Sequence, residues 1–277
     1  MRIGLMVNSM REDAMAYARR AVAFLLGKGI KVYAEDDVAV FLGDGVRSFA
    51  QAHDVTAVIS MGGDGTLLRG AQYAMRWDAA LLGINLGRVG FLTEVEPDDI
   101  EAALTAVIEG NYTTQTRPVL NISVGQNTWY ALNDAVLSRG VNTRLITIDA
   151  LVDGESSGRY VGDGIVVATP TGSTGYSLSA GGPVVAPGVD CMVITPICAH
   201  TLQHRPCVVH GGAHITLELL PEDEQTASLQ VDGQARAVLR SGERVEIRMD
   251  QHCVQLIRIN PEHFFQLVRD KLTEWTR

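Results

Sequence analysis

The stretch VTAVISMGGDGTLLRG (residues 55–70) joins an apolar run to a glycine-rich turn and to the beginning of a helix. The run at 55–61 is almost entirely apolar, which is typical of a strand in a parallel sheet covered on both faces. The glycines at 62, 63 and 65 let backbone amides approach an anion, and a helix from about Thr66 adds its partial positive charge. The stretch therefore predicts a parallel α/β sheet with an anion site at the end of a strand.

Strand and helix patterns alternate around this stretch, as they do in crossover units that build parallel sheets. We expect strands at 3–7, 31–34 and 81–85, and helices at 12–28 and 97–109. The side chains that the first helix offers for burial are Ala16, Ala23, Phe24 and Leu26. The sequence thus predicts an N-terminal α/β domain over residues 1–116 with a parallel sheet.

The pattern of residue types changes near residue 116, where short β-branched runs separated by turn residues replace the helical patterns. We expect strands at 119–124, 147–152, 165–168, 215–220, 228–231 and 244–248. Asp153-Gly154 and Ser241-Gly242 are typical of hairpin turns. This pattern predicts an all-β domain over residues 117–259. A last helical pattern at 261–276 predicts that residues 260–277 form a helix that packs back on the first domain.

Composition excludes several classes of partner. The 277 residues carry 23 basic and 32 acidic side chains, a formal net charge of −9, which argues against nucleic acids and anionic membranes. No apolar run approaches the roughly 20 residues of a membrane helix, and the N-terminus lacks a secretory pattern. The four cysteines form no CxxC pair, so we expect buried free thiols and a cytoplasmic location.

One dense group of nitrogen and sulfur donors suggests a metal site. It consists of His200, His204, Cys207 and His210. The segment after His200 lacks the glutamate of HExxH, and Pro206 would end a helix there. A strand beginning at Cys207 would point the donors to different faces. We therefore expect structural histidines and no protein-built zinc site.

Asp64 is unusual in a phosphate-binding turn, because its charge opposes that of the ligand. The placement makes chemical sense if the carboxylate accepts a proton from an attacking hydroxyl or orients a metal beside the phosphates. The alternative is a tight turn in which Asp64 is the helix N-cap. The turn is neither a GxGxxG dinucleotide motif nor a Walker loop.

Two further motifs carry polar groups suited to a nucleotide. The block at 162–183 ends a strand and continues as a loop rich in hydroxyls and glycines, in which Tyr176 can stack on a base. In the segment 129–137, Asn133 and Asp134 interrupt an apolar run; asparagine can pair with adenine and aspartate can hold a ribose hydroxyl. Taken alone, each of them also fits an ordinary loop or turn.

Together these motifs resemble the NAD kinase family over nearly the whole chain. The resemblance is carried by GGDGT at 62–66, LND at 132–134, the block at 163–183, the segment at 196–206 and VDGQ at 231–234. The first motif alone is shared with diacylglycerol and sphingosine kinases. The resemblance implies an N-terminal α/β domain, a C-terminal β-sandwich domain and NAD bound in the crevice between them.

The same resemblance implies roles for single residues. Asp64 is then the catalytic aspartate, which takes the proton from the 2′-hydroxyl of the adenosine ribose as NAD becomes NADP. Asn133 and Asp134 hold the dinucleotide, and Asp163 meets its nicotinamide end. The residues implied in substrate binding are Gly63, Gly65, Thr66, Phe91, Asn133, Asp134, Arg144, Asp163, Thr171, Thr174, Gly175, Tyr176, Ser177, Leu178, Ser179 and Gln234.

The family also implies the co-reactants and the assembly. Its members use ATP, and some use inorganic polyphosphate, with a divalent cation such as Mg²⁺, and they generally form homo-oligomers such as dimers or tetramers. Val161 stands where some relatives carry a charged residue, which leaves the preference between NAD and NADH open. The alternatives are a lipid kinase with the same glycine–aspartate turn and a non-catalytic dinucleotide sensor. The first lacks a membrane-binding segment here, and the second gains nothing from Asp64.

Overall fold

The chain divides into two units. The computed structural model describes residues 1–87, 90–140, 144–200, 204–221, 226–259 and 264–274. Unit 1 consists of Met1–Thr116 and Val254–Arg277, and unit 2 of Arg117–Cys253. The chain passes between the units in two long strands, β6 (Thr113–Val124) and β17 (Arg244–Arg258).

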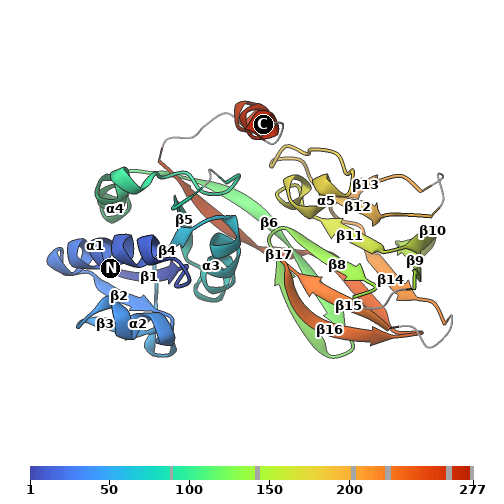
Figure 1. Ribbon diagram of the computed structural model, residues 1–277, viewed down its shortest axis with the longest axis horizontal. Helices are drawn as coiled ribbons and strands as arrows, with labels where there is room; N and C mark the ends of the chain where they lie inside the picture. The colour runs from blue at the N-terminus through green and yellow to red at the C-terminus, as the bar shows by residue number, and fades with distance from the viewer. Residues whose placement is uncertain (88–89, 141–143, 201–203, 222–225, 260–263, 275–277) are drawn as a thin grey trace. The chain divides into compact units, whose positions relative to one another are not determined.

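Unit 1 is built on a parallel sheet (Figure 1). Its strands are β1 (Arg2–Val7), β2 (Lys31–Ala34), β3 (Val46–Ser48), β4 (Ala57–Gly62) and β5 (Ala80–Asn85), in the order β5-β4-β1-β2-β3. The end of β17 adds a further parallel strand, with Leu256 beside Leu81. The order reverses between β1 and β4, which is where open α/β sheets bind ligands beyond the carboxyl ends of their strands. The glycine-rich turn follows β4 at this point.

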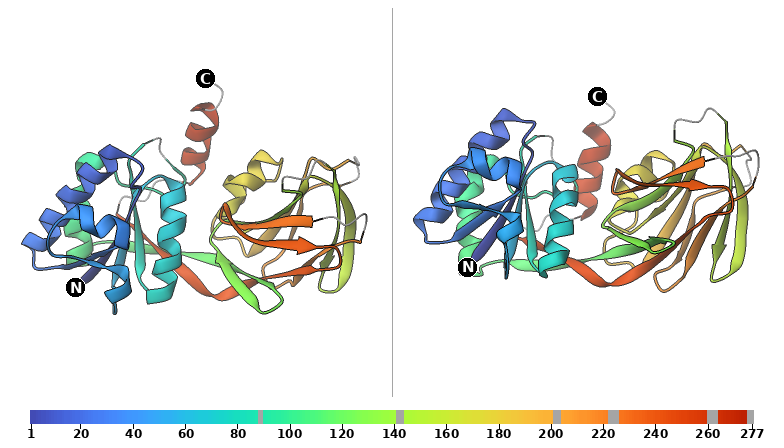
Figure 2. Two further views of the ribbon diagram at one scale, coloured as in Figure 1. Left: turned by 60° about the horizontal axis from the view of Figure 1, so that its bottom comes forward. Right: turned by 90° about the horizontal axis from the view of Figure 1, so that it is seen from below.

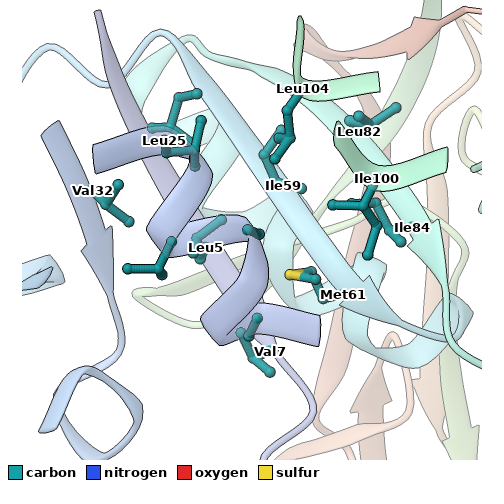
Figure 3. Close-up of a cluster of buried hydrophobic side chains, with 14 of the residues drawn as sticks. Leu5, Val7, Leu25, Val32, Ile59, Met61, Leu82, Ile84, Ile100 and Leu104 are labelled. Carbon is teal, nitrogen blue, oxygen red and sulfur yellow. The ribbon is translucent and has the colours of Figure 1, made fainter. Parts of the chain in front are cut away.

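Helices cover both faces of this sheet. They are α1 (Glu12–Gly27), α2 (Asp36–Leu42), α3 (Asp64–Trp77) and α4 (Ile100–Glu109), with 3₁₀ turns at Phe49–Gln51 and Pro97–Asp99. Helices α1, α2 and α4 share one apolar cluster with alternate strand residues such as Leu5, Ile59 and Leu82 (Figure 3). Gly70 of α3 lies against the side chains of Met6 and Ser60, which point to the opposite face.

The first third of the chain confirms most of the predicted elements and corrects two details. The predicted burial face of the first helix is half right. Phe24 and Leu26 are partly buried against the core cluster, but Ala16 and Ala23 are exposed, and the buried residues of α1 are Ala14, Ala18, Ala21, Val22 and Leu25. The phase was misjudged because alanines occur on every face of this helix. Helix α2 and strand β3 were not predicted, since each is short. The predicted C-terminal helix is described as α6 (Phe264–Glu274); positions 260–263 and 275–277 lie outside the described residues.

Unit 2 contains antiparallel strands in two layers (Figure 2). One layer has the order β13-β12-β11-β8-β15-β16, and the other contains β10-β9-β14-β17 with the β6–β7 hairpin. The remaining strands are β7 (Asn127–Ala131), β8 (Asp134–Ser138), β9 (Ile146–Val152), β10 (Glu155–Gly162), β11 (Gly164–Ala168), β12 (Cys191–Ile197), β13 (Cys207–His210), β14 (Ile215–Leu219), β15 (Thr226–Val231) and β16 (Gln234–Arg240).

The core of unit 2 lies between the two layers. Leu137, Ile165 and Ile194 come from one layer, and Ile148 and Leu217 from the other, and they belong to a single buried cluster. A smaller cluster on the outer face of the first layer lies beneath the loop after β11 and includes Val136, Val166 and Val193. The α/β domain followed by an antiparallel β domain is therefore confirmed.

Two expectations for the second half are wrong in detail. Ser241-Gly242 forms a turn but no hairpin, because β16 pairs with β15 in one layer and β17 pairs with β14 in the other. The four thiols are free, as expected, but only Cys191 is buried, and Cys198 is exposed. Within the described ranges, no helix is long and apolar enough to span a bilayer.

Candidate active site

Asp64 stands at the beginning of α3, directly after the turn that follows β4. The N-cap is Gly63, whose backbone is extended, so Asp64 is not the cap residue. Its carboxylate reaches across to the loop after β5, where the N–H of Phe91 donates to Oδ2 at 2.8 Å and the N–H of Leu92 to Oδ1 at 3.1 Å. Asp64 is half-buried, and two backbone amides fix its direction.

Glycines give this carboxylate its space. A Cβ atom on Gly90 would lie 1.9 Å from Oδ1 of Asp64, so any larger residue there would displace the carboxylate. A Cβ on Gly62 would lie 2.4 Å from the hydroxyl oxygen of Thr66, which is buried. A Cβ atom on Gly63 or Gly65 would meet no other atom within 4 Å, and Gly65 is exposed. The turn thus leaves room for a ligand at Gly63 and Gly65, whereas the N–H of Thr66 donates to the carbonyl of Gly63 at 3.0 Å.

In unit 2, the turn Leu132-Asn133-Asp134 is held by a residue that the sequence did not single out. Oδ2 of Asp232 accepts the N–H of Leu132 at 2.9 Å, and Oδ1 accepts those of Asn133 at 2.8 Å and Asp134 at 3.2 Å. The only sequence signal was the Asp-Gly turn within VDGQ. Oδ1 of Asn133 is buried and has no hydrogen-bond partner among the residues that the structure describes, which leaves an acceptor for a ligand.

The carboxyl groups of Asp134 and Asp232 titrate unusually. Burial, together with the negative charge of Asp232, raises the pKa of Asp134 to about 7. Burial also raises the pKa of Asp232 to about 6, although the three N–H bonds and the charge of Arg236 oppose the shift. Because those N–H bonds favour a charged Asp232, Asp134 is the carboxyl group of the two that binds its proton more tightly.

The loop after β11 contains most of the other predicted binding residues, and it uses many of its hydroxyls internally. Thr171 accepts from Arg117 Nη1 at 3.3 Å, and Thr174 donates to the carbonyl of Thr171 at 3.1 Å. Ser177 is fully buried and shares a hydrogen bond with Thr195 at 2.8 Å. The hydroxyls of these three residues therefore stabilise the loop.

Other parts of the same loop are open to a ligand. The ring of Tyr176 is 45% exposed, Ser179 is exposed, and Leu178 is partly buried. A Cβ on Gly175 would lie 3.4 Å from Nδ2 of Asn133 and 3.7 Å from Oδ2 of Asp134. The loop and the 132–134 turn therefore form one continuous polar surface in unit 2.

Two predicted residues, Asp163 and Arg144, lie away from this surface, whereas Gln234 pairs with Val231, which lies beside Ala135, directly after the turn. Asp163 precedes β11 and pairs with Arg139 at 2.7 Å. Gly164 pairs with Ser138 and Ala168 with Asp134, so Asp163 lies at the opposite end of the strand from the turn. At about 3.3 Å per residue, these ends are about 13 Å apart. Arg144 is exposed in the bend before β9, and Gln234 is exposed at the beginning of β16.

Metal donors are sparse in the part of the chain that the structure describes. There, no group of three or more histidine, cysteine, aspartate or glutamate side chains could hold a metal ion. The ring of His204, one of the zinc donors considered above, packs on Tyr160 with centroids 4.4 Å apart. Mg²⁺ does not need such a group, because it keeps several waters and takes one or two carboxylates together with substrate phosphates. The Asp64 carboxylate beside the open backbone of Gly63 and Gly65 fits that mode of binding.

Comparison with known proteins covers both units. The pattern of the ATP-NAD kinase N-terminal domain matches residues 3–112, and that of the ATP-NAD kinase C-terminal domain matches residues 132–259. NAD kinases of Syntrophotalea carbinolica and Desulforamulus reducens are each 37% identical to this chain. The alignments cover 98% of both chains in the first case, and 99% of this chain and 97% of the relative in the second.

Solved structures agree with this match. An NAD kinase from Archaeoglobus fulgidus in complex with ATP is 26% identical, with a TM-score of 0.76 and 99% of each chain covered. A yeast NADH kinase complexed with NADH has a TM-score of 0.83, covering 97% of this chain and 85% of the other, and at 23% identity it supports the fold. With full-length relatives well above 30% identity and both domain patterns present, the chain belongs to the ATP-NAD kinase family.

Proposed function

We propose that this chain transfers the γ-phosphoryl group of ATP to the 2′-hydroxyl of the adenosine ribose of NAD, giving NADP and ADP. Membership of the family gives the class of reaction. The single observation that carries the assignment to this chain is Asp64, a carboxylate at the sheet's switch point, held in one direction by two backbone amides. A turn that only binds phosphate, and transfers no proton, has no need of a negatively charged side chain.

In this proposal the 2′-oxygen attacks the γ-phosphorus in line while the bond to the bridging oxygen of ADP breaks. Asp64 receives the hydroxyl proton as the new O–P bond forms. The amides of Gly63 and Gly65 at the first turn of α3 stabilise phosphate charge, aided by the partial positive charge of the helix, and Thr66 supports the turn through its N–H bond to the carbonyl of Gly63 at 3.0 Å. Phe91, whose N–H orients Asp64, lines the same site.

A divalent cation, Mg²⁺ in the simplest case, belongs to the proposal as a companion of ATP. Asp64 is the residue that would offer it a protein oxygen, and the rest of its ligands would be phosphate oxygens and water. When bound, Mg²⁺ neutralises charge on the phosphates. Inorganic polyphosphate is the alternative donor, because the same amides would bind its phosphates.

The dinucleotide is recognised in unit 2. The buried, unpartnered Oδ1 of Asn133 accepts from the amino group of adenine, and Asp134 accepts from a ribose hydroxyl. The exposed ring of Tyr176 stacks on a base, and the loop residues Thr171, Thr174, Gly175, Ser177, Leu178 and Ser179 shape the pocket through backbone and apolar contacts. Asp163, Arg144 and Gln234 make the outer contacts.

The proposal extends to organisation and location. We assign residues 1–116 with the C-terminal helix to the α/β domain and residues 117–259 to the dinucleotide-binding domain. The protein is expected to be a cytoplasmic homo-oligomer, a dimer or tetramer, and its four free thiols fit a reducing compartment. Light scattering on the purified protein tests the assembly, and a monomer at micromolar concentration would contradict it.

The activity is tested with purified protein, NAD, ATP and Mg²⁺, and NADP is detected with a coupled NADP-specific dehydrogenase. We expect NADP from the wild type, and a loss of about 10²–10⁴-fold in kcat for Asp64→Asn, the size of a general-base contribution. The matched control is Asp78→Asn, at the other end of the same helix, where Asp78 is exposed in a left-handed conformation that asparagine also adopts.

The outcomes separate the possibilities. Product with polyphosphate and none with ATP would change the donor and keep the reaction. Product with NADH exceeding that with NAD would change the acceptor. An Asp64→Asn enzyme with wild-type kcat would remove Asp64 from the mechanism, and a wild type that binds NAD but makes no NADP with any donor would leave a dinucleotide sensor.

A further inference from the structure

The turn Leu132-Asn133-Asp134 has its backbone hydrogen bonds satisfied in an unusual way. Its three N–H groups all donate to the single carboxylate of Asp232, about 100 residues later in the chain, at 2.8–3.2 Å. The hydroxyl of Thr169 donates to the carbonyl of Leu132 at 2.6 Å, and the N–H of Thr169 to that of Asn133 at 2.9 Å. The N–H of Asp232 donates to the carbonyl of Asp134 at 3.0 Å.

Two residues therefore hold all six backbone polar groups of the turn. Neighbouring strands satisfy such groups in a regular ladder, but the turn lies where β7 has ended and β8 begins. A charged acceptor shared by three amides makes short, strong bonds and fixes direction more tightly than neutral acceptors do. The turn is also confined sterically, since a Cβ on Gly172 would lie 2.0 Å from the carbonyl oxygen of Asn133.

We infer that Asp232 is a positioning residue for dinucleotide binding, acting by fixing the 132–134 turn so that the Asn133 amide and the Asp134 carboxyl face the ligand. The inference rests on the proposed function, because it concerns the same ligand. Its direct support is that the turn carries a buried acceptor, Asn133 Oδ1, that has no partner within the described part of the chain. An unpaired acceptor of this kind is useful to a ligand only if its direction is fixed.

The position of Asp232 has an electrostatic consequence as well. Its charge faces Asp134, and Arg236 of β16 faces Asp232. From the loop after β11 the turn meets the uncharged Thr169, Gly172 and Gly175, and the cation of Arg117 contacts that loop through Thr171. Removing the charge of Asp232 therefore favours ionised Asp134, and any pH dependence that Asp134 gives to NAD binding moves to lower pH.

The test is NAD binding to the full-length protein, measured by isothermal titration calorimetry from about pH 5.5 to about pH 8. The test variant is Asp232→Asn, which keeps the left-handed turn conformation (φ 47°) accessible while losing the charge and the second acceptor oxygen. We expect its Kd for NAD to rise about tenfold, as for the loss of one or two charge-assisted hydrogen bonds. The acid limb of binding should shift to lower pH, and the KM for ATP should stay within about twofold.

Asp153→Asn is the matched control. Asp153 also precedes a glycine in a turn, has φ 52°, and accepts one backbone N–H, from His214 at 2.8 Å, but it lies at the β9–β10 hairpin. Its Kd for NAD should match the wild type. Thr169→Val, which removes one bond to the same turn without changing charge, should weaken NAD binding and leave the acid limb in place.

Each result has a definite reading. Wild-type Kd and an unmoved acid limb in Asp232→Asn would overturn the inference. So would equal losses for NAD and ATP together with a lower Tm, because a merely structural role affects both substrates. NADP formation is assayed in parallel: a wild type that binds NAD without making NADP contradicts the proposed kinase activity, while the Kd comparison still decides the role of Asp232.

Discussion

Asp64 and the loop after β5 form a small preorganised unit within unit 1. The carboxylate accepts two amide N–H groups from Phe91 and Leu92, and the hydroxyl of Thr93 in turn accepts the N–H of Gly90 at 3.3 Å. Glu94, one residue further, accepts the N–H of Ile259 at 2.8 Å and the guanidinium of Arg258 at 3.1 Å. The direction of the carboxylate thus depends on a chain of contacts that ends on β17.

Gly90→Ala tests whether the direction of the Asp64 carboxylate depends on this loop, because it adds a single methyl group beside the carboxylate. The added methyl group would overlap Oδ1 of Asp64 at 1.9 Å, so either the carboxylate or the loop must move. Because a misplacement of about 1 Å at a reacting group can reduce the rate about 10²-fold, we expect a loss of that order in kcat. Steady-state NADP formation measures it, with the KM for NAD expected to change little.

Gly87→Ala is the control from the same loop. A Cβ at Gly87 meets only the tip of the Arg11 guanidinium at 2.7 Å, which can swing away because Gly87 is exposed. Its kcat should equal that of the wild type. Equal activity of both variants would show that Gly90 does not hold Asp64 in its working position.

At the residue scale, the sequence pointed to the groups that we propose bind or react, and it missed the residues that hold these groups in place. Asp64 was predicted because a negative charge is unusual in a phosphate-binding turn. Asn133 and Asp134 fit an ordinary turn when taken alone, and they were predicted through the resemblance of the whole chain to a family. Asp232 and Gly90 could not be predicted from local pattern, since their roles arise from contacts about 100 and 26 residues away along the chain, which only the folded structure brings together. The internal use of the Ser177 hydroxyl was hidden for the same reason.

At the element scale, some strands were predicted with the wrong extents, and others, such as β12 and β16, were not predicted at all. Runs such as those of β4 and β11 are apolar throughout because both faces are covered, and this signal is strong. Strands β6 and β17 are longer than predicted. Each continues into a segment where apolar and polar residues no longer alternate, so the sequence pattern did not show its full length. Part of the α1 burial face was predicted wrongly because alanine contributes little to a periodic pattern.

The corrected face of α1 leads to a prediction about two adjacent leucines. Leu25 is fully buried in the cluster beneath α1 (Figure 3). Leu26 is only partly buried where it packs against that cluster. Leu25→Ala should lower the free energy of unfolding by about 2–5 kcal/mol, and Leu26→Ala by about 1 kcal/mol. Urea denaturation followed by circular dichroism measures both, and equal losses would contradict the observed face.

At the scale of the whole molecule, the free energy of unfolding depends on every group whose pKa changes on folding. In unit 2, the carboxyl groups of Asp134 and Asp232 lower this free energy at neutral pH. The pKa of Asp134 is raised from 3.8 to about 7 and that of Asp232 to about 6, by burial first. A carboxyl group whose native pKa is raised binds its proton more tightly in the folded state. Its contribution to stability is therefore lost as the pH rises from about 4 through about 7.

Asp134→Asn removes this loss, because the amide resembles the protonated acid. The variant should match the wild type near pH 4 and become more stable by up to about 4 kcal/mol near pH 8, the free energy of about three pKa units.

Asp250→Asn should change stability in the opposite direction. Burial raises the pKa of Asp250, but hydrogen bonds from Asn121 and His252 outweigh burial and lower that pKa. That variant should be less stable than the wild type near pH 8, with the deficit shrinking as the pH falls. Urea midpoints at several pH values measure both trends, and parallel profiles for the two variants would show that burial does not perturb Asp134.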